Sequence, residues 1–506
     1  MTVKLTSFKS FRPDVVLFRS DMPHNVCVCQ YHENMNLILQ GLGRINTIPD
    51  NHKLFLRTLC CDTDNENCIF GKCETCQRKI STDSLAELVD DDELLSENAK
   101  WFKWIRTDEG KMAKVEETGT VNDALQLLAD KLPAFKIHCF IKSKQAAEFV
   151  LAYSNPRPNH AVMQIDFSEN AAIIEQDEVQ SAHWSHIQVT IFTAVAWIME
   201  DTKSYCITSD TQSHDKYTAA VFLNTLIDNL RAAMPGELTD LDIFSDGAGQ
   251  HFKQKYMFLF ISSLLESKGI RIHWHFFGTS HGKGAVDGIG GTVKRTVFSG
   301  VKSRRYHITN AEEYASCAKE LLKSTTILHV SSAEINDMKP ELDKLWGAAI
   351  TVPGTHNVHC VRTISHGVVS VSNYSRQVGS THCLLPQAAI DTQDTTFKPE
   401  NNPSDETPIP DKTPIADETL IIEYVPSQSV PDPSSEEEKE AASFVVAGTG
   451  MLSTGRKLIT GSLDRPCMSI RRTSQNGCSH SSSKLTKKQT VSRQQMTLTL
   501  LNLITF

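Results

Sequence analysis

Val162-Met-Gln-Ile-Asp-Phe167 and Leu241-Asp-Ile-Phe-Ser-Asp-Gly247 are short apolar runs that each close on an acid. Both patterns predict buried strands, and the second strand leads into a Ser-Asp-Gly turn. Between them, the β-branched run His186–Ile198 and the segment Tyr205–Thr208 predict two more strands. The first three strands follow one another without an intervening helix, which is typical of an antiparallel meander.

Helical patterns separate the later strands. Between Tyr217 and Leu230 apolar residues recur every three or four positions, which predicts an amphipathic helix that ends at Pro235-Gly236. A second helix is predicted around Met257–Leu264, followed by a strand at Ile270–Phe277 and a third helix from about Asp287. The resulting order, β-β-β-α-β-α-β-α, is the plan of a ribonuclease H-like α/β core.

Three acids fall at related places in this plan. Asp166 lies at the end of the first strand, Asp246 at the end of the fourth, and Asp287 at the start of the helix after the fifth. Strands one and four are neighbours in such a sheet, so we expect the carboxylates to converge. Converging carboxylates suit two Mg²⁺ or Mn²⁺ ions, which activate the attacking oxygen and stabilise the leaving oxygen in phosphoryl transfer. The sequence therefore predicts Asp166, Asp246 and Asp287 as catalytic magnesium ligands, although each acid alone also suits a turn or a helix cap.

The segment Gly278-Thr-Ser-His-Gly-Lys-Gly-Ala-Val-Asp-Gly-Ile-Gly-Gly291 contains six glycines in 14 residues. Its spacing matches neither a nucleotide P-loop nor a Rossmann fingerprint. The glycines either let the backbone approach a phosphate closely, beside His281 and Lys283, or form a flexible turn.

Residues 251–305 carry ten Lys and Arg against two acids, inside a mildly acidic body. Such a segment is typical of a surface that binds the DNA backbone with salt-dependent affinity, and a solvated basic helix face is the alternative. His273 and His275, on one face of the fifth strand, are expected to form hydrogen bonds and not to bind metal. The predicted nucleic-acid contacts are His281, Lys283, Lys253, Lys294 and Arg295.

Seven of the 14 cysteines lie before Gln77, in the pattern Cys27-x-Cys29-x2-His32 followed by Cys60-Cys61-x6-Cys68-x4-Cys73-x2-Cys76. Zinc binds four thiolate or imidazole ligands in a tetrahedron, and a two-residue spacer between cysteines closes one corner of it. We expect a structural Zn²⁺ held by Cys68, Cys73 and Cys76 together with Cys29, His32 or Cys61. A set of ordinary buried thiols is the alternative.

The composition of the 506 residues, 40% hydrophobic and 22% charged, excludes several classes of protein. The longest uncharged apolar runs, Val189–Met199 and Met496–Phe506, have 11 residues, whereas a membrane-spanning helix needs roughly 20. The first residues lack the apolar core of a secretion signal. We therefore expect no membrane partner and no secretion, with cysteines that serve as thiols or metal ligands.

The sequence predicts five regions. Residues 1–80 form a Cys/His-rich zinc module, 81–155 a helical linker domain, 156–310 the ribonuclease H-like core and 311–385 its C-terminal extension. The extension contains a predicted helix at Ala311–Leu322 and strand-like runs at Ala348–Val352 and Gly367–Val371. Residues 386–506 are expected to be a disordered tail, first acidic and Pro-rich and then basic, because such compositions cannot bury enough apolar surface.

Several motifs carry a family resemblance: Cys29-x2-His32-Glu33-Asn34, Asp166-Phe-Ser-Glu-Asn170, Ser245-Asp246-Gly247 with Gln250-x-Phe252-Lys253, and the glycine-rich segment with Lys294-Arg295. Over about residues 10–380 the chain resembles an uncharacterised, multi-copy, transposon-derived group of animal proteins. The resemblance implies a relative of ribonuclease H-like DDE/D transposases, with an N-terminal zinc module and a core that cuts and joins DNA. Asp166 and Asp246 fall where such cores place their first two acids, and many transposases carry Glu where Asp287 stands.

Three functions remain open from the sequence. The first is transposase-like DNA strand cleavage and transfer. The second is a catalytically inactive, domesticated transposase that acts as a zinc-containing DNA-binding or adaptor protein, and the third is a ribonuclease H-like nuclease on RNA or hybrid duplexes. The first two imply DNA as the partner, a nuclear location and, because transposases often act as dimers, a homo-oligomer.

Overall fold

The computed structural model describes residues 16–17, 29–199, 201–282, 284–386 and 445–446. The chain divides into a unit of His24–Glu438 and a unit made of Met1–Pro23 with Lys439–Phe506. The described residues of the smaller unit are two short antiparallel strands, β1 (Val16–Leu17) and β13 (Val445–Val446). The expectation of a disordered tail over 386–506 lies almost entirely outside the described residues.

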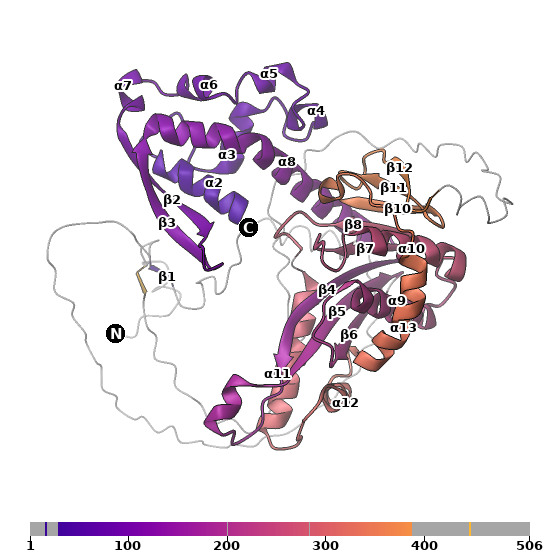
Figure 1. Cartoon of the computed structure of the whole chain (residues 1–506). Coiled ribbons are helices and arrows are strands. Elements are labelled where there is room, and N and C mark those ends of the chain that lie inside the picture. Colours follow the sequence, from indigo (N-terminus) through magenta and orange to yellow (C-terminus); the bar gives the residue numbers. More distant parts are fainter. Residues whose placement is uncertain (1–15, 18–28, 200, 283, 387–444, 447–506) are drawn as a thin grey trace, which may run out of the picture. The chain divides into compact units, whose positions relative to one another are not determined.

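A nine-stranded mixed sheet organises the larger unit, in the order β12-β11-β10-β8-β7-β4-β5-β6-β9 (Figure 1). The strands β4 (His160–Ala172), β5 (Gln188–Ile198) and β6 (Asp201–Ser209) form an antiparallel meander. The strand β7 (Asp240–Ser245) pairs in parallel with β4, and β8 (Arg271–Phe276) pairs in parallel with β7. The predicted meander is therefore confirmed, and the fold is a mixed α/β fold.

Helices connect the later strands as the hydrophobic periodicity predicts. They are α9 (Lys216–Ala233), α10 (Lys255–Lys268) and α11 (Ala285–Lys302), which give the order β4-β5-β6-α9-β7-α10-β8-α11. Helix α9 begins at Asp215, whose carboxylate accepts the backbone N–H groups of Tyr217 and Thr218. Helix α10 ends at Gly269, where φ of +70° favours glycine.

The alternation of side chains along β4 separates two layers. Ala161, Met163 and Ile165 point into the main hydrophobic core with α9 and α10. Val162 packs on the opposite face, in a small cluster with Phe149 and Phe244. Helix α11 lies on this second face, because its residues pack against the far ends of β4 and β5. Up to the irregular pairing between Ser168 and Ala171, even-numbered residues of β4 therefore face the glycine-rich segment and α11, and beyond it Ala171 packs on this side.

The region 311–385 adds elements to both edges of the sheet. Helix α12 (Ala311–Leu321) leads to β9 (Thr326–His329) beside β6, and helix α13 (Ser332–Trp346) follows. Three antiparallel strands extend the other edge beside β8: β10 (Cys360–Ser365), β11 (Val368–Ser372) and β12 (Ser380–Cys383). A short 3₁₀ helix, Thr355–Asn357, precedes β10.

One expectation for this region is wrong, and one helix has no counterpart among the expectations. The run Ala348–Val352 is no strand, because Ala349 continues the turn after α13 and donates its N–H to the Trp346 carbonyl at 3.0 Å. The run is apolar because part of it is buried, since Val352 contributes to the main core. Helix α13 was not expected; it carries Pro340 in its interior, and only Ile335, Leu342 and Trp346 are fully buried.

The N-terminal part of the larger unit has a core of its own. The helices of this N-terminal part are α2 (Gln30–Gly41), α3 (His52–Leu59), α4 (Glu66–Ile69), α5 (Glu74–Gln77), α6 (Thr82–Ala86), α7 (Asp92–Leu95) and the long helix α8 (Val121–Ser154). The core is formed mainly by α2, α3, α6 and α8. Residues 98–120, expected within a helical linker, instead form the hairpin β2 (Asn98–Arg106) and β3 (Met112–Thr120). Buried Ala99 and Trp101 alternate with exposed Asn98, Lys100 and Phe102, and Gly110 with φ of +78° turns the chain.

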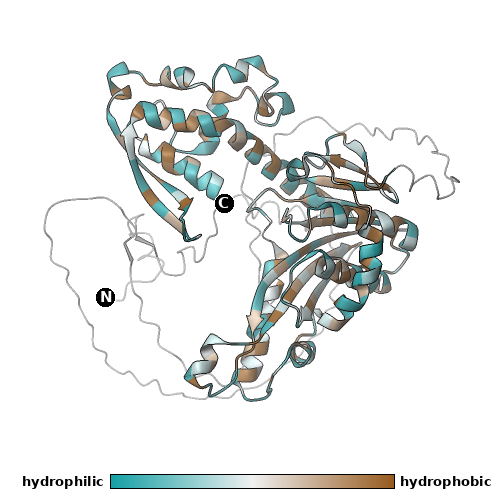
Figure 2. Cartoon of the chain, in the orientation of Figure 1, coloured by the Kyte–Doolittle hydropathy of each residue, from teal (hydrophilic) through white to brown (hydrophobic). Residues whose placement is uncertain are grey.

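Apolar residues gather on the strands and on one side of the helices, as Figure 2 shows. Among the described residues, every helix is too short or too polar to cross a membrane.

Candidate active site and metal centres

The register of the sheet places Asp166 beside Asp246. In the parallel pair of β4 and β7, Gln164 lies opposite Phe244, which is the last pair of that ladder. Two further steps along each chain lead to Asp166 and to Asp246, so the two acids occupy the same row. Strand β4 continues to Ala172 beside β5. Asp166 thus lies inside its strand and not at its end as expected, at the point where β7 stops.

Electrostatics bring Asp287 into the same group. Burial, followed by the negative charges of Asp246 and Asp287, raises the pKa of Asp166 to about 7. Asp287 lies in the first turn of α11, where its Oδ2 accepts the N–H of Gly284 at 2.8 Å. Asp287 therefore also caps helix α11, which is the alternative role expected for it. The three predicted carboxylates lie close enough to repel one another, in an arrangement that a cation would relieve.

Glycines let α11 begin directly against β4. A Cβ on Gly284 would lie 2.6 Å from Nε2 of Gln164, and a Cβ on Gly290 would lie 2.3 Å from Oγ of Ser168. The Gln164 amide also donates to the Gly282 carbonyl at 3.1 Å. These glycines therefore serve close packing of the helix on the sheet, which carries Asp287 toward Asp166.

The predicted nucleic-acid contacts lie in different surroundings. Lys253 is 8% exposed and donates to the His356 carbonyl at 2.9 Å, and burial lowers its pKa to about 8. Arg295 is exposed on α11. Lys294 lies 3.0 Å from the Glu169 carbonyl oxygen and 3.6 Å from its carboxylate. Lys283 lies outside the described residues.

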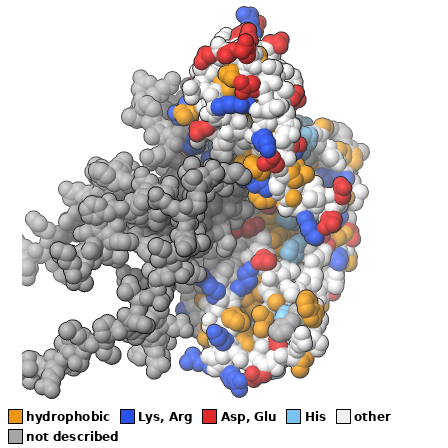
Figure 3. Space-filling view, turned by 90° about the vertical axis from the view of Figure 1, so that its left-hand side faces the viewer, with side chains coloured by type: hydrophobic (Ala, Val, Ile, Leu, Met, Phe, Trp, Pro, Cys, Tyr) orange, Lys and Arg blue, Asp and Glu red, His pale blue; other side chains and the backbone are white. Residues whose placement is uncertain are grey.

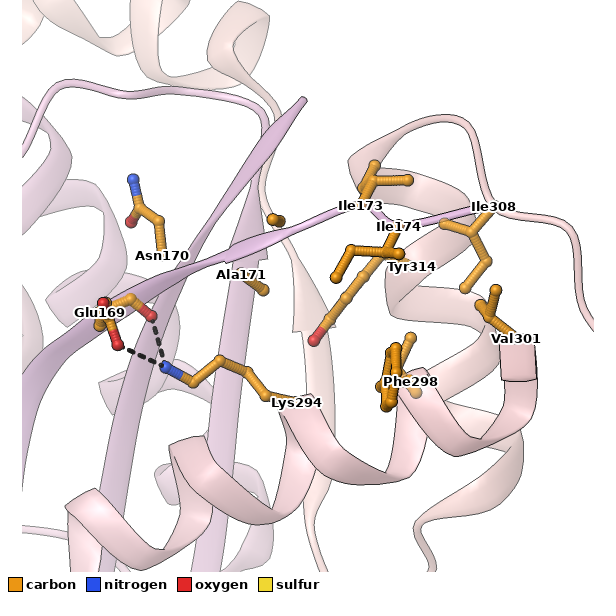
Figure 4. A pocket seen from close by; sticks show the side chains of 12 residues that line it. Glu169, Asn170, Ala171, Ile173, Ile174, Lys294, Phe298, Val301, Ile308 and Tyr314 are labelled. Atoms are coloured by element: carbon orange, nitrogen blue, oxygen red, sulfur yellow. Dashed lines mark hydrogen bonds and ion pairs between the residues drawn. The ribbon is translucent and has the colours of Figure 1, made fainter. Parts of the chain in front are cut away.

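A pocket of about 250 Å³ adjoins Lys294, between the end of β4 and helices α11 and α12 (Figure 4). The Lys294–Glu169 pair lies at one end of it, and Ile173, Phe298 and Tyr314 line the other end. In the space-filling view of Figure 3, acidic side chains gather at the upper end of the visible face, and basic and hydrophobic side chains occur both there and lower on it.

One compact group of cysteines matches the zinc pattern. Cys61, Cys68, Cys73 and Cys76 offer four sulfur atoms within 4.8 Å of one another. The group lies on and around the short helices α4 and α5, and a hydrogen bond from the Cys76 backbone is the main cause that lowers the pKa of Cys73 to about 7. Buried Lys136 of α8 donates to the Cys68 carbonyl at 3.2 Å, which ties α8 to this group. Of the three candidates for the fourth ligand, Cys29, His32 and Cys61, the structure therefore brings Cys61 beside the other cysteines of this group.

Cys29 and His32 belong to a second group. Their ligand atoms lie within 4.8 Å of those of His138 and His281. Nε2 of His138 is 3.2 Å from Sγ of Cys29 and also 3.2 Å from Nε2 of His281. Burial, followed by neighbouring imidazoles, lowers the pKa of His32 to about 3 and that of His281 to about 4, so these rings are neutral at pH 7. Sequence reasoning missed His138, because it lies within a long helix without any ligand spacing around it, and it assigned His281 to nucleic acid.

The chain is similar to two families, both without assigned function. Residues 145–375 match the model of Domain of unknown function (DUF8701), and residues 30–136 match that of Domain of unknown function (DUF8700). No curated protein and no solved structure matches the chain. The two matched regions meet within α8.

Proposed function

We propose that this protein is a ribonuclease H-like DDE/D nuclease of the transposase type, which cleaves and transfers DNA strands with two divalent metal ions. The observation that carries the proposal is the register of β4 and β7. Extended two residues beyond its last pair, Gln164 and Phe244, it brings Asp166 level with Asp246, and Asp287 is near enough to raise the pKa of Asp166. A half-buried carboxylate that faces two other acids is typical of a site for hard cations.

The topology supports the ribonuclease H-like assignment. The order β6-β5-β4-β7-β8, with an antiparallel meander and two parallel strands added through α9 and α10, is the arrangement of such cores. In that arrangement the first and fourth strands are neighbours. The sheet also carries additions at both edges, β9 beside β6 and β10–β12 beside β8.

In the proposed reaction, Asp166, Asp246 and Asp287 would hold Mg²⁺ or Mn²⁺. Two such ions supply activation of the attacking oxygen and stabilisation of the leaving oxygen. The Gln164 amide, hydrogen-bonded to the Gly282 carbonyl, keeps the glycine-rich segment against the sheet. Exposed Arg295, with Lys294 on the same helix, offers positive charge to a phosphate backbone. Cys61, Cys68, Cys73 and Cys76 would hold a structural Zn²⁺.

The proposal is tested by a DNA cleavage assay on the full-length chain. The substrates are duplex DNA with the gene's own flanking sequence and an RNA–DNA hybrid, each with and without Mg²⁺ or Mn²⁺. We expect metal-dependent cutting of DNA that Asp246→Asn abolishes. The matched control is Asp240→Asn on the same strand, since Asp240 is paired with Arg271 at 3.1 Å outside the carboxylate row. Equal activity of both variants would refute the carboxylate site, and preferential cutting of the hybrid would assign the site to RNA.

A second function, DNA binding without catalysis, has one specific observation in its favour. The Asp287 carboxylate already accepts the Gly284 N–H, so helix capping alone can account for this acid. A domesticated DNA-binding or adaptor protein would retain salt-dependent DNA binding and show no metal-dependent cleavage in the same assay. Both functions predict a nuclear location, which fluorescence imaging of the tagged chain would test.

A further inference from the structure

We propose that Cys29, His32, His138 and His281 form a second zinc site, which fastens the glycine-rich segment to α8 and to the start of α2. This site shares no ligand with the four-cysteine group. Zn²⁺ is the ion that such a set selects, because one thiolate with three imidazoles suits its tetrahedral geometry and its borderline-soft character. Four protein ligands fill that tetrahedron, so the site is structural.

The spacing of the ligand atoms fits one ion. Zinc–sulfur and zinc–nitrogen bonds of about 2.3 and 2.0–2.1 Å place tetrahedral ligand atoms about 3.3–3.8 Å apart. The two distances from Nε2 of His138, to Cys29 and to His281, are both 3.2 Å. The four atoms together lie within 4.8 Å of one another. A small displacement of the side chains would bring them to the distances of a bound ion.

Hydrogen bonding alone leaves contacts in this group unexplained. A ring nitrogen carries either one hydrogen or one lone pair, so Nε2 of His138 makes one good hydrogen bond and not two. Nδ1 of His32 is buried and has no hydrogen-bond partner among the described residues. Buried polar atoms in native proteins are nearly always satisfied, which favours a ligand in this place.

The start of α2 places the side chains of Cys29 and His32 on the same side of the helix. Cys29 is the N-cap residue of α2, yet its sulfur makes no capping hydrogen bond and lies beside His138. His32 follows one helical turn later, on the same side of α2. The ring centroids of Tyr31 and Phe135 lie 4.9 Å from that of His138 and 5.4 Å from that of His32, so aromatic rings pack against two of the proposed ligands.

The consequence concerns the glycine-rich segment. His281 directly precedes Gly282, where a Cβ would lie 3.6 Å from Cβ of Asp246. At the other end of this loop, Gly278 packs on the backbone of Lys142 in α8, with a built Cβ 3.3 Å from its Cα. An ion held by His138 and His281 would fix the loop between these two contacts. The zinc site itself stands whether or not the carboxylates are catalytic, whereas its influence on Asp246 rests on the proposed function.

The test measures zinc per chain by atomic emission on the full-length protein in reducing buffer. We expect two zinc ions in the parent, one in His138→Ala, and two again in His138→Cys, since cysteine restores a ligand. Cys76→Ser removes the other ion, and His382→Gln, a histidine outside both groups, keeps two. We also expect faster hydrogen exchange in residues 278–282 of His138→Ala than in the parent.

The outcomes separate this site from the four-cysteine group. A single zinc ion that is lost in Cys76→Ser and kept in His138→Ala would overturn the second site. A single ion lost in His138→Ala and kept in Cys76→Ser would uphold it and refute the four-cysteine site. If His138→Ala fails to fold, His138→Cys decides, and one zinc ion in that folded variant would overturn the proposal.

Discussion

Asp242, which is buried, and Asp166, which is half-buried, lie on neighbouring strands, and the charged groups around them have opposite signs. Asp242 on β7 lies 3.0 Å from Nε2 of His160 and 3.1 Å from Nδ1 of His273. Burial acts to raise its pKa, but hydrogen bonds from these rings and from His275 hold the pKa well below its usual range. Asp166 faces other carboxylates, and its pKa is raised to about 7. The protein itself supplies hydrogen-bond donors to Asp242, whereas Asp166 is the acid for which we propose a metal ion.

The largest expected effect is on stability, at Asp242. We expect Asp242→Asn to destabilise the protein by about 3–5 kcal/mol, because it removes the buried negative charge and replaces one of the two oxygens that face His160 and His273 by an amide donor. Chemical denaturation with and without Mg²⁺ measures this, and the ion should not restore the loss. A neutral effect of the substitution would mean that the histidine network does not stabilise the fold.

The next effect is on activity, at Asp287. We expect Asp287→Asn to lower metal-dependent cleavage by more than the roughly 10–100-fold that loss of an outer-shell partner of a metal costs. The Asn amide oxygen still accepts the Gly284 N–H, so the helix cap and the melting temperature should be retained. Asp287→Glu, which keeps a carboxylate, should retain measurable activity. Full activity of Asp287→Asn would assign this acid to capping alone.

The smallest effect is a pH dependence, at Asp166. Its folded pKa lies above the unfolded value of about 3.8, so its charge destabilises the metal-free fold increasingly as pH rises from about 4 to 7. We expect Asp166→Asn to leave stability unchanged near pH 4 and, after allowance for solvent screening, to raise it by on the order of 1 kcal/mol above pH 7. Denaturation curves at several pH values measure this difference, and Mg²⁺ should abolish it. A stabilisation that is the same at all pH values would contradict the proposed repulsion.

Local patterns in the sequence predict more of the fold than of the site. Periodicity and Gly or Pro at segment ends are local signals, and they give the order of strands and helices from Val162 to Lys302. The hairpin at 98–120 was not predicted, because its alternation of apolar and polar residues is short and is flanked by helical sequence. The hydrogen-bonded role expected for His273 and His275 is confirmed, since they contact Asp242 and Ser375.

The same contrast separates the two Cys/His groups. Cys61, Cys68, Cys73 and Cys76 lie within 16 consecutive residues, so their spacing is visible in the sequence. Cys29 and His32 meet His138 and His281 only through packing of α2, α8 and the loop before α11. No spacing rule connects such distant positions, and the orientation of α8 has to be known before His138 can be assigned.

The most direct test of the carboxylate site is crystallography of the full chain with Mn²⁺ and anomalous scattering. The proposed function predicts two manganese peaks about 3.5–4 Å apart, in contact with oxygens of Asp166, Asp246 and Asp287 and absent beside Asp242. Crystals equilibrated with Mn²⁺ that show no peak between these three carboxylates would contradict it.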